Sequence, residues 1–150
     1  MPLKKLAVFD WNGTILADSH ITWRVAAECI RLAGGRSIDR ARHRETVTLP
    51  LMDMFLANGC DAETVHRGAE EQRTLFAREY DRHARTCGTR QGLRALLAWL
   101  DDRNVHKIIL SNHTEEDIRF HLRRLKLESH FPHVSAHPPE HGSILYRTSK

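Results

Sequence analysis

One stretch decides the fold of this chain: Leu6-Ala7-Val8-Phe9-Asp10-Trp11-Asn12-Gly13-Thr14-Ile15. Its first residues form an apolar run that is typical of a buried strand in a parallel sheet. Asp10 ends this run, and a polar turn follows it. In open α/β sheets, ligands bind at the carboxyl ends of the strands. The stretch therefore predicts that Asp10 lies where chemistry takes place, or, in a simpler interpretation, that Asp10 only caps the turn.

A second apolar run, at residues 105–110, ends at Ser111-Asn112 and predicts another strand. A third and shorter strand is expected at residues 133–136. Helical patterns separate these runs, so we expect a parallel sheet with right-handed crossovers. Because the carboxyl ends of parallel strands meet at one edge, Asp10 and Ser111 are predicted to face the same pocket. The predicted fold class is α/β, with a Rossmann-like parallel sheet.

Residues 18–85 have helical periodicity and no strand pattern, which predicts an inserted α-helical cap subdomain. The core then consists of residues 1–17 and 86–150. The expected cap helices cover residues 20–33 with Ser19 as N-cap, 38–45, 51–57 after Pro50, and a long helix from Asp61 to about Tyr80. The expected core helices cover residues 90–102, capped by Thr89, and a segment that starts at Thr114.

The composition excludes several classes of protein. The chain has 150 residues, of which 41% are hydrophobic, enough for one domain with a sizeable core. No apolar run approaches the ~20 residues of a membrane span, and the first strand begins too early for a signal peptide. The cysteines, Cys29, Cys60 and Cys87, are odd in number and widely spaced, which indicates reduced thiols. We therefore expect a cytoplasmic protein without a membrane partner.

The net charge of +4 comes mostly from arginines on predicted helix faces. No aromatic residues alternate with these arginines, and the sequence has no known nucleic-acid-binding module. The arginines are therefore better interpreted as solvated helix faces than as a nucleic-acid interface. A positive field also favours a phosphorylated substrate.

Two motifs resemble those of the haloacid dehalogenase (HAD) superfamily. Phe9-Asp10-Trp11-Asn12-Gly13-Thr14-Ile15-Leu16 is similar to its first motif, Asp-x-Asp-Gly-Thr followed by an aliphatic residue. Ile109-Leu110-Ser111-Asn112 is similar to its second motif, a hydrophobic strand that ends in Ser or Thr. Residues 90–97 and 125–134 resemble the family's segments before the second and third strands. The phosphoglycolate-phosphatase-like hydrolases, which carry a helical cap, are the subgroup that the chain resembles most.

The resemblance implies a Mg²⁺-dependent phosphatase that acts on a small phosphorylated metabolite. Asp10 would attack phosphorus and form an aspartyl-phosphate, since a carboxylate is ionised at pH 7 without help from a base. Ser111 would donate a hydrogen bond to the phosphoryl group, and Mg²⁺ would bind to Asp10 and to the backbone carbonyl of Asn12.

The turn from Trp11 to Thr14 would supply backbone N–H groups to the phosphate, with Gly13 allowing close approach. Thr14 either steadies this turn or is a turn residue alone. Asn112 either contacts the ligand or caps the following helix, and the cap is the favoured interpretation.

Three departures from the family's pattern bear on function. The family's phosphatases carry a second Asp at the position of Asn12, where it protonates the leaving oxygen and activates water. An amide does neither, and losing a general acid–base group typically costs on the order of 10²–10⁴ in rate. The family's Lys after the third strand would be Lys150, with Lys126 as the other candidate; the simpler interpretation of Lys150 is a frayed terminus.

The third departure is that the sequence has no counterpart of the fourth motif, a pair of acids on a further strand that pairs with the first. We therefore expect residues 6–9 to form an exposed edge that favours a homo-oligomer, in a chain that is shortened or recruits a strand. The alternative function is a non-catalytic or truncated HAD-like protein that acts as a binding module. A receiver-like domain, which lacks room for the helical insertion, is a weaker third hypothesis.

Overall fold

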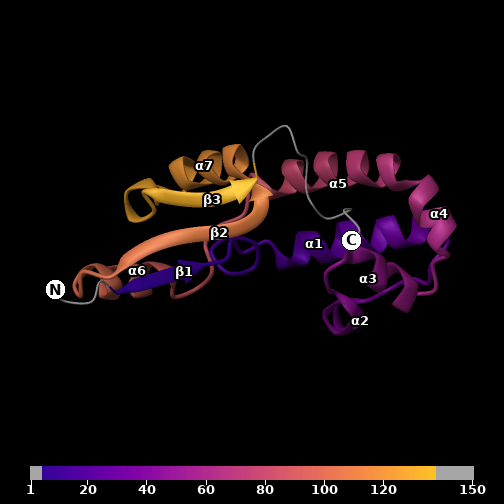
Figure 1. Cartoon of the computed structure of the whole chain (residues 1–150), viewed down its shortest axis with the longest axis horizontal. Helices are drawn as coiled ribbons and strands as arrows, with labels where there is room; N and C mark the ends of the chain where they lie inside the picture. The colour runs from indigo at the N-terminus through magenta and orange to yellow at the C-terminus, as the bar shows by residue number, and fades with distance from the viewer. Residues whose placement is uncertain (1–4, 138–150) are drawn as a thin grey trace. The chain divides into compact units, whose positions relative to one another are not determined.

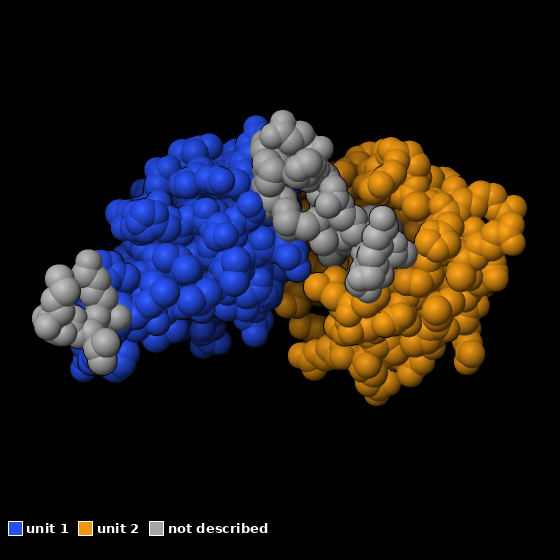
Figure 2. Space-filling model, viewed as in Figure 1, with its two compact units in different colours: residues 1–17, 87–144 blue, residues 18–86, 145–150 orange. Residues whose placement is uncertain are grey.

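The computed structural model describes residues 5–137, which form two compact units (Figure 2). Of the described residues, 5–17 and 87–137 belong to the first unit, and 18–86 to the second. In chain order the elements are β1 (Leu6–Phe9), α1 (Ser19–Leu32), α2 (Arg40–Thr46), α3 (Leu51–Ala57), α4 (Ala62–Arg67), α5 (Ala69–Ala84), α6 (Leu93–Asp101), β2 (His106–Thr114), α7 (Glu115–Arg124), a 3-10 turn (Glu128–His130) and β3 (His133–His137) (Figure 1). The predicted α/β fold class is confirmed.

The sheet of the first unit has the order β1-β2-β3, and both pairings are parallel. The register between β1 and β2 ends at the pair Phe9–Ile109, so Asp10 lies one residue beyond it and Ser111 two residues beyond it. We predicted that the second strand ends at Ser111, and this was wrong, because β2 pairs with β3 again at Thr114 after a shift in register. Asp10 and Ser111 nevertheless reach the same edge of the sheet.

The core of the first unit lies on one face of this sheet. Residues on β2 alternate, with Ile109 and Ser111 buried and Leu110 exposed, as expected for the two-residue period of a strand. Phe9 is buried on β1, and its ring packs edge-on against that of Phe131 with centroids 5.4 Å apart. The fully buried apolar residues of α7, Ile118 and Leu122, complete this core.

The other face of the sheet is less covered. Leu6 and Val8 of β1 are 56% and 54% exposed, and Leu110 is 57% exposed. Within residues 5–137, β1 pairs only with β2, so its second edge has no strand beside it. The expected exposed apolar edge at residues 6–9 is therefore present in the described part of the chain.

A buried charge is neutralised near the start of β2. Lys107 is only 7% exposed, and its ammonium group forms an ion pair with Asp101 at the end of α6. His130 Nδ1 lies 2.9 Å from the other carboxylate oxygen of Asp101. The hydrogen bond from Lys107, and to a smaller extent His130, lowers the pKa of Asp101. This network ties α6, β2 and the 3-10 turn together at the end of the sheet away from Asp10.

The helices of the second unit pack around α1 and α5. The buried residues of α1, Ile21, Val25, Ala26, Cys29 and Ile30, recur at helical spacing. Asp18 precedes this helix, is fully buried, and accepts a hydrogen bond from the hydroxyl of Tyr80 on α5. The residue at the N-cap is therefore Asp18 and not Ser19 as predicted. The helix after Pro50 is confirmed at Leu51–Ala57.

Two observed helix boundaries differ from the predicted ones, in each case at a glycine. Asp61 caps a helix as predicted, with Thr64 N–H donating to its carboxylate at 2.9 Å. The expected long helix is interrupted at Gly68, however, and gives α4 and α5. The helix predicted to start at residue 90 starts at Leu93, because Gly92 has a φ of 82°, a left-handed conformation outside helical geometry. Thr89 forms a backbone bridge with Leu16 in place of the predicted cap.

All three cysteines are free and buried, and burial raises the pKa of the Cys29 thiol to about 12. None of the helices in residues 5–137 is long and apolar enough to cross a bilayer.

Candidate active site

The turn after β1 is built around one carbonyl group. The carbonyl oxygen of Trp11 accepts hydrogen bonds from the backbone N–H groups of Thr14, Ile15 and Leu16, at 3.3, 3.0 and 3.1 Å. Gly13 has a φ of 71° within this turn, a conformation that costs other residues free energy. The sequence Asp-Trp-Asn-Gly-Thr thus forms a tight turn at the carboxyl end of β1.

Asp10 is exposed at the start of this turn. Its Oδ1 accepts a hydrogen bond of 2.7 Å from the N–H of Trp11, the next residue. This bond fixes the orientation of the carboxylate relative to the turn. An exposed carboxylate held in one orientation suits nucleophilic attack.

Backbone pairing connects the turn to the segment that returns from the second unit. Ala17 N–H donates to Gly88 at 3.0 Å, Arg90 N–H donates to Ile15 at 3.0 Å, and Leu16 pairs with Thr89 between them. The two ends of the inserted unit are therefore joined directly beside the turn that carries Asp10.

Ser111 is 9% exposed, and its Oγ accepts a hydrogen bond of 3.1 Å from the N–H of His113. This bond uses an oxygen lone pair, so the hydroxyl proton remains available to an acceptor such as a phosphoryl oxygen. Asn112 is exposed and still lies within β2. It therefore does not cap the next helix, and the interpretation that we favoured from the sequence was wrong. Thr114 occupies that N-cap, and its Oγ1 donates to Asp117 Oδ2 at 2.6 Å.

His113 lies near the same end of β2, and it is not among the site residues predicted from the sequence. Its Nδ1 accepts a hydrogen bond of 2.8 Å from Thr114 N–H and lies 3.8 Å from Asp117 Oδ2. In the neutral imidazole this leaves the proton on Nε2. Its position two residues after Ser111, on the strand that ends at the site, is the signal that could have identified it.

The side chain of Trp11 faces the interior. It is fully buried, with its ring centroid 6.1 Å from that of His121, and its Nε1 has no hydrogen-bond partner within the described residues. Trp11 can therefore meet a ligand only through its backbone. The N–H groups of Trp11 and Thr14 already donate to Asp10 and to the Trp11 carbonyl, so the predicted phosphate cradle is partly occupied by internal hydrogen bonds.

The structure describes one of the two predicted lysines. Lys150 lies outside the described residues. Lys126 follows the last turn of α7, before β3 begins, and therefore belongs to the opposite end of the parallel sheet.

The donor set suits a sparse Mg²⁺ site. No group of three or more His, Cys, Asp or Glu side chains that could bind a metal occurs in residues 5–137. Mg²⁺ usually keeps several waters and binds one or two carboxylates together with substrate phosphates. The exposed carboxylate of Asp10, with the backbone carbonyl of Asn12, fits that minimal pattern.

Residues 7–143 match the sequence profile of the haloacid dehalogenase-like hydrolases, and the chain belongs to this family. No curated protein matches the sequence significantly.

Several solved structures share the fold. They include a predicted phosphatase from Clostridium acetobutylicum, with TM-score 0.69 and 19% identity over 95% of this chain and 64% of that chain. A haloacid dehalogenase-like hydrolase from Streptococcus pneumoniae has TM-score 0.69 and 19% identity over 93% and 64%. Protein Tyrosine Kinase A from Mycobacterium tuberculosis has TM-score 0.71 and 20% identity over 100% and 64%. This chain thus spans slightly less than two thirds of the length of these three proteins.

Replacing Gly13 with alanine should destabilise the turn. The positive φ of Gly13 costs a residue with a Cβ about 1–2 kcal/mol, so we expect the free energy of unfolding to fall by that amount in urea titrations. Gly88→Ala is the matched control, because Gly88 has space for a Cβ and no positive φ. Equal losses in both variants would show that the conformation of Gly13 is not the cause.

Proposed function

We propose that this chain is a HAD-like phosphatase that hydrolyses a small phosphorylated metabolite through an aspartyl-phosphate at Asp10. The observation that carries the proposal is the position of Asp10, exposed at the carboxyl end of β1 and beside the strand end that holds Ser111. Membership of the hydrolase family supports the same reaction class. The free, buried cysteines support a reducing compartment such as the cytoplasm.

In the proposed reaction, Asp10 Oδ2 forms a bond to phosphorus while the bond from phosphorus to the ester oxygen breaks, and this oxygen leaves with the electron pair and takes up a proton from solvent water. A second water then attacks phosphorus, gives up a proton to solvent, and releases the Asp10 carboxylate and inorganic phosphate. The hydrogen bond from Trp11 N–H to Oδ1 keeps the nucleophile oriented through both steps. Ser111 donates its hydroxyl proton to a phosphoryl oxygen, where negative charge develops. Mg²⁺ held by Asp10 and the Asn12 carbonyl would neutralise part of the phosphoryl charge when bound.

Asn12 limits this reaction, because its amide cannot protonate the leaving oxygen. The proposed substrate class therefore includes esters whose leaving group departs readily without an acid. The same residue favours a second candidate function, a non-catalytic module that binds phosphorylated ligands without turnover.

Trapping the proposed intermediate tests the nucleophile. Beryllofluoride with Mg²⁺ mimics a phosphoryl group on a carboxylate, so we expect both together to raise the unfolding temperature, since a ligand that binds only the folded state stabilises it. Asp10→Asn should abolish this shift. Asp102→Asn is the matched control, because Asp102 is exposed and is the C-cap of α6, before β2 begins, at the end of the sheet away from Asp10. An unchanged shift in Asp10→Asn, or no shift in the natural sequence, would contradict the proposal.

Restoring the acid at position 12 tests the role of Asn12. Asn12→Asp should raise the rate of hydrolysis of an alkyl phosphate by about 10²–10⁴, the range typical of general acid–base catalysis. The rise should be smaller with p-nitrophenyl phosphate, whose leaving group needs little protonation. Phosphate release with both substrates measures this difference. If neither rate rises while the beryllofluoride complex still forms, the non-catalytic function is favoured.

We also propose that a second copy of this chain pairs with the unpaired edge of β1. Leu6 and Val8 leave this edge apolar and exposed, and charged residues on edge strands oppose such pairing. We expect a dimer by light scattering and a monomer for Val8→Lys. Leu96→Lys, at a 44% exposed site on α6, should remain dimeric. A monomer for the natural sequence at all concentrations would argue against strand pairing.

A further inference from the structure

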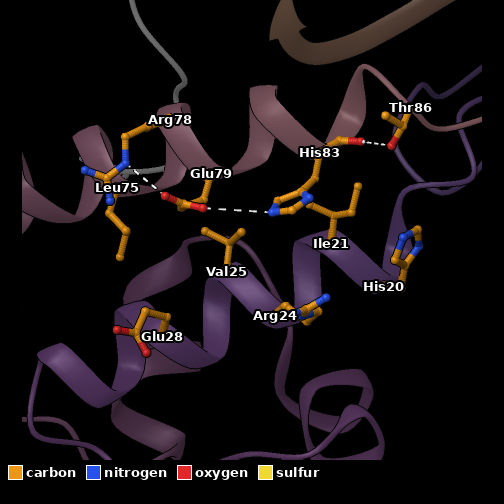
Figure 3. A pocket seen from close by; sticks show the side chains of 10 residues that line it. All are labelled: His20, Ile21, Arg24, Val25, Glu28, Leu75, Arg78, Glu79, His83 and Thr86. Carbon is orange, nitrogen blue, oxygen red and sulfur yellow. Dashed lines mark hydrogen bonds and ion pairs between the residues drawn. The ribbon is translucent and has the colours of Figure 1, made fainter.

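The helical unit contains a groove between α1 and α5 with a volume of about 430 Å³ (Figure 3). Sites for small molecules typically measure about 300–1,000 Å³. The described residues that line this groove all belong to residues 18–86, whereas Asp10 and Ser111 belong to the other unit. The described lining of the groove is therefore built from the helical unit alone.

The floor of the groove is apolar. Ile21 and Val25 of α1 are 4% and 5% exposed, and Figure 3 shows both side chains directed towards α5. Leu75, which is partly buried, extends from α5 towards them. A short hydrocarbon body placed here would lose contact with water on several sides, and such burial is favourable by about 25 cal/mol per Å².

The acidic side chains that line the groove are already neutralised. Both oxygens of Glu28 accept hydrogen bonds from Arg31, at 2.9 and 2.6 Å, and this pairing lowers the pKa of Glu28. Glu79 accepts a hydrogen bond of 2.9 Å from Arg78 Nε, and its other oxygen lies 3.9 Å from His83 Nε2 (Figure 3). Because both carboxylates already have positively charged partners, they are poor binding groups for a cationic ligand.

One permanent positive charge remains without compensation. Arg24 lines the groove and is exposed, and within residues 5–137 it makes no hydrogen bond or ion pair. His20 lies four residues earlier on α1, which places the two side chains on the same face of the helix. A guanidinium group has five N–H donors in a planar fork that matches a carboxylate or a phosphate.

We infer that this groove binds a small organic anion, in which a carboxylate or phosphate meets Arg24 and His20 and a short apolar body lies against Ile21, Val25 and Leu75. The inference goes beyond the proposed phosphatase activity and does not depend on turnover at Asp10. The anion supplies the charge that Arg24 lacks, and the apolar floor discriminates against anions without a hydrocarbon body.

Titrations of the full chain followed by amide NMR test this site with benzoate as the probe. We expect saturable shifts in residues 20–28 and 75–83. Inorganic phosphate, which has no apolar body, should bind more weakly, and benzylammonium should cause no saturable shift. Arg24→Gln should weaken benzoate binding about tenfold or more, because it removes the charge from a hydrogen bond to the carboxylate.

Two control variants distinguish binding in this groove from a general effect of positive charge and from binding at Asp10. Arg73→Gln removes the same charge from α5 at a residue that pairs with Glu70 outside the groove, and it should leave benzoate binding unchanged. Asp10→Asn should also leave it unchanged, so failure of the phosphatase proposal would not affect this result. Equal weakening in Arg73→Gln and Arg24→Gln, unchanged binding in Arg24→Gln, or shifts confined to residues 10–14 would each overturn the inference.

Discussion

The backbone pairing between residues 15–17 and 88–90 is the constraint on which the rest of the structure depends. A helical unit is inserted into the chain immediately after the turn that follows β1. Such an insertion would disturb the turn if its two ends were free to move apart. Because Leu16 pairs with Thr89 and hydrogen bonds flank this pair on both sides, the ends are held together. The sheet can therefore form as though the chain passed directly from residue 17 to residue 87.

The same pairing keeps the turn compact at the point where the proposed chemistry takes place. Three N–H groups converge on the Trp11 carbonyl, and a fourth, that of Trp11, orients Asp10. These bonds preorganise the carboxylate but also reduce the number of donors that remain for a phosphoryl group. The described part of the site therefore has a well-oriented carboxylate and few groups that could neutralise charge or move protons, and the amide of Asn12 adds no proton donor of that kind.

Local sequence signals predicted the elements that depend on local structure. Pro50 precedes α3 as expected, and apolar runs identified β1 and β2. Tertiary contacts decided the rest. Pairing with β3 extends β2 beyond Ser111, and the left-handed conformation of Gly92 delays α6. The position of Asp10 followed from topology alone, and the helix start predicted at Thr114 is confirmed by its place as the N-cap of α7. The inward orientation of Trp11 required the packed structure.

The hydrogen bond between Asp18 and Tyr80 closes the helical unit upon itself. Asp18 is the first residue of this unit, and Tyr80 lies 62 positions later, near its end. Both side chains are almost completely buried, so the bond joins the entry and the exit of the insertion without using any residue of the sheet. An inserted segment that secures its own ends in this way can diverge, or be exchanged for another, while the strand that carries Asp10 keeps its sequence. Modular evolution of binding specificity around a fixed reaction centre would require this kind of independence.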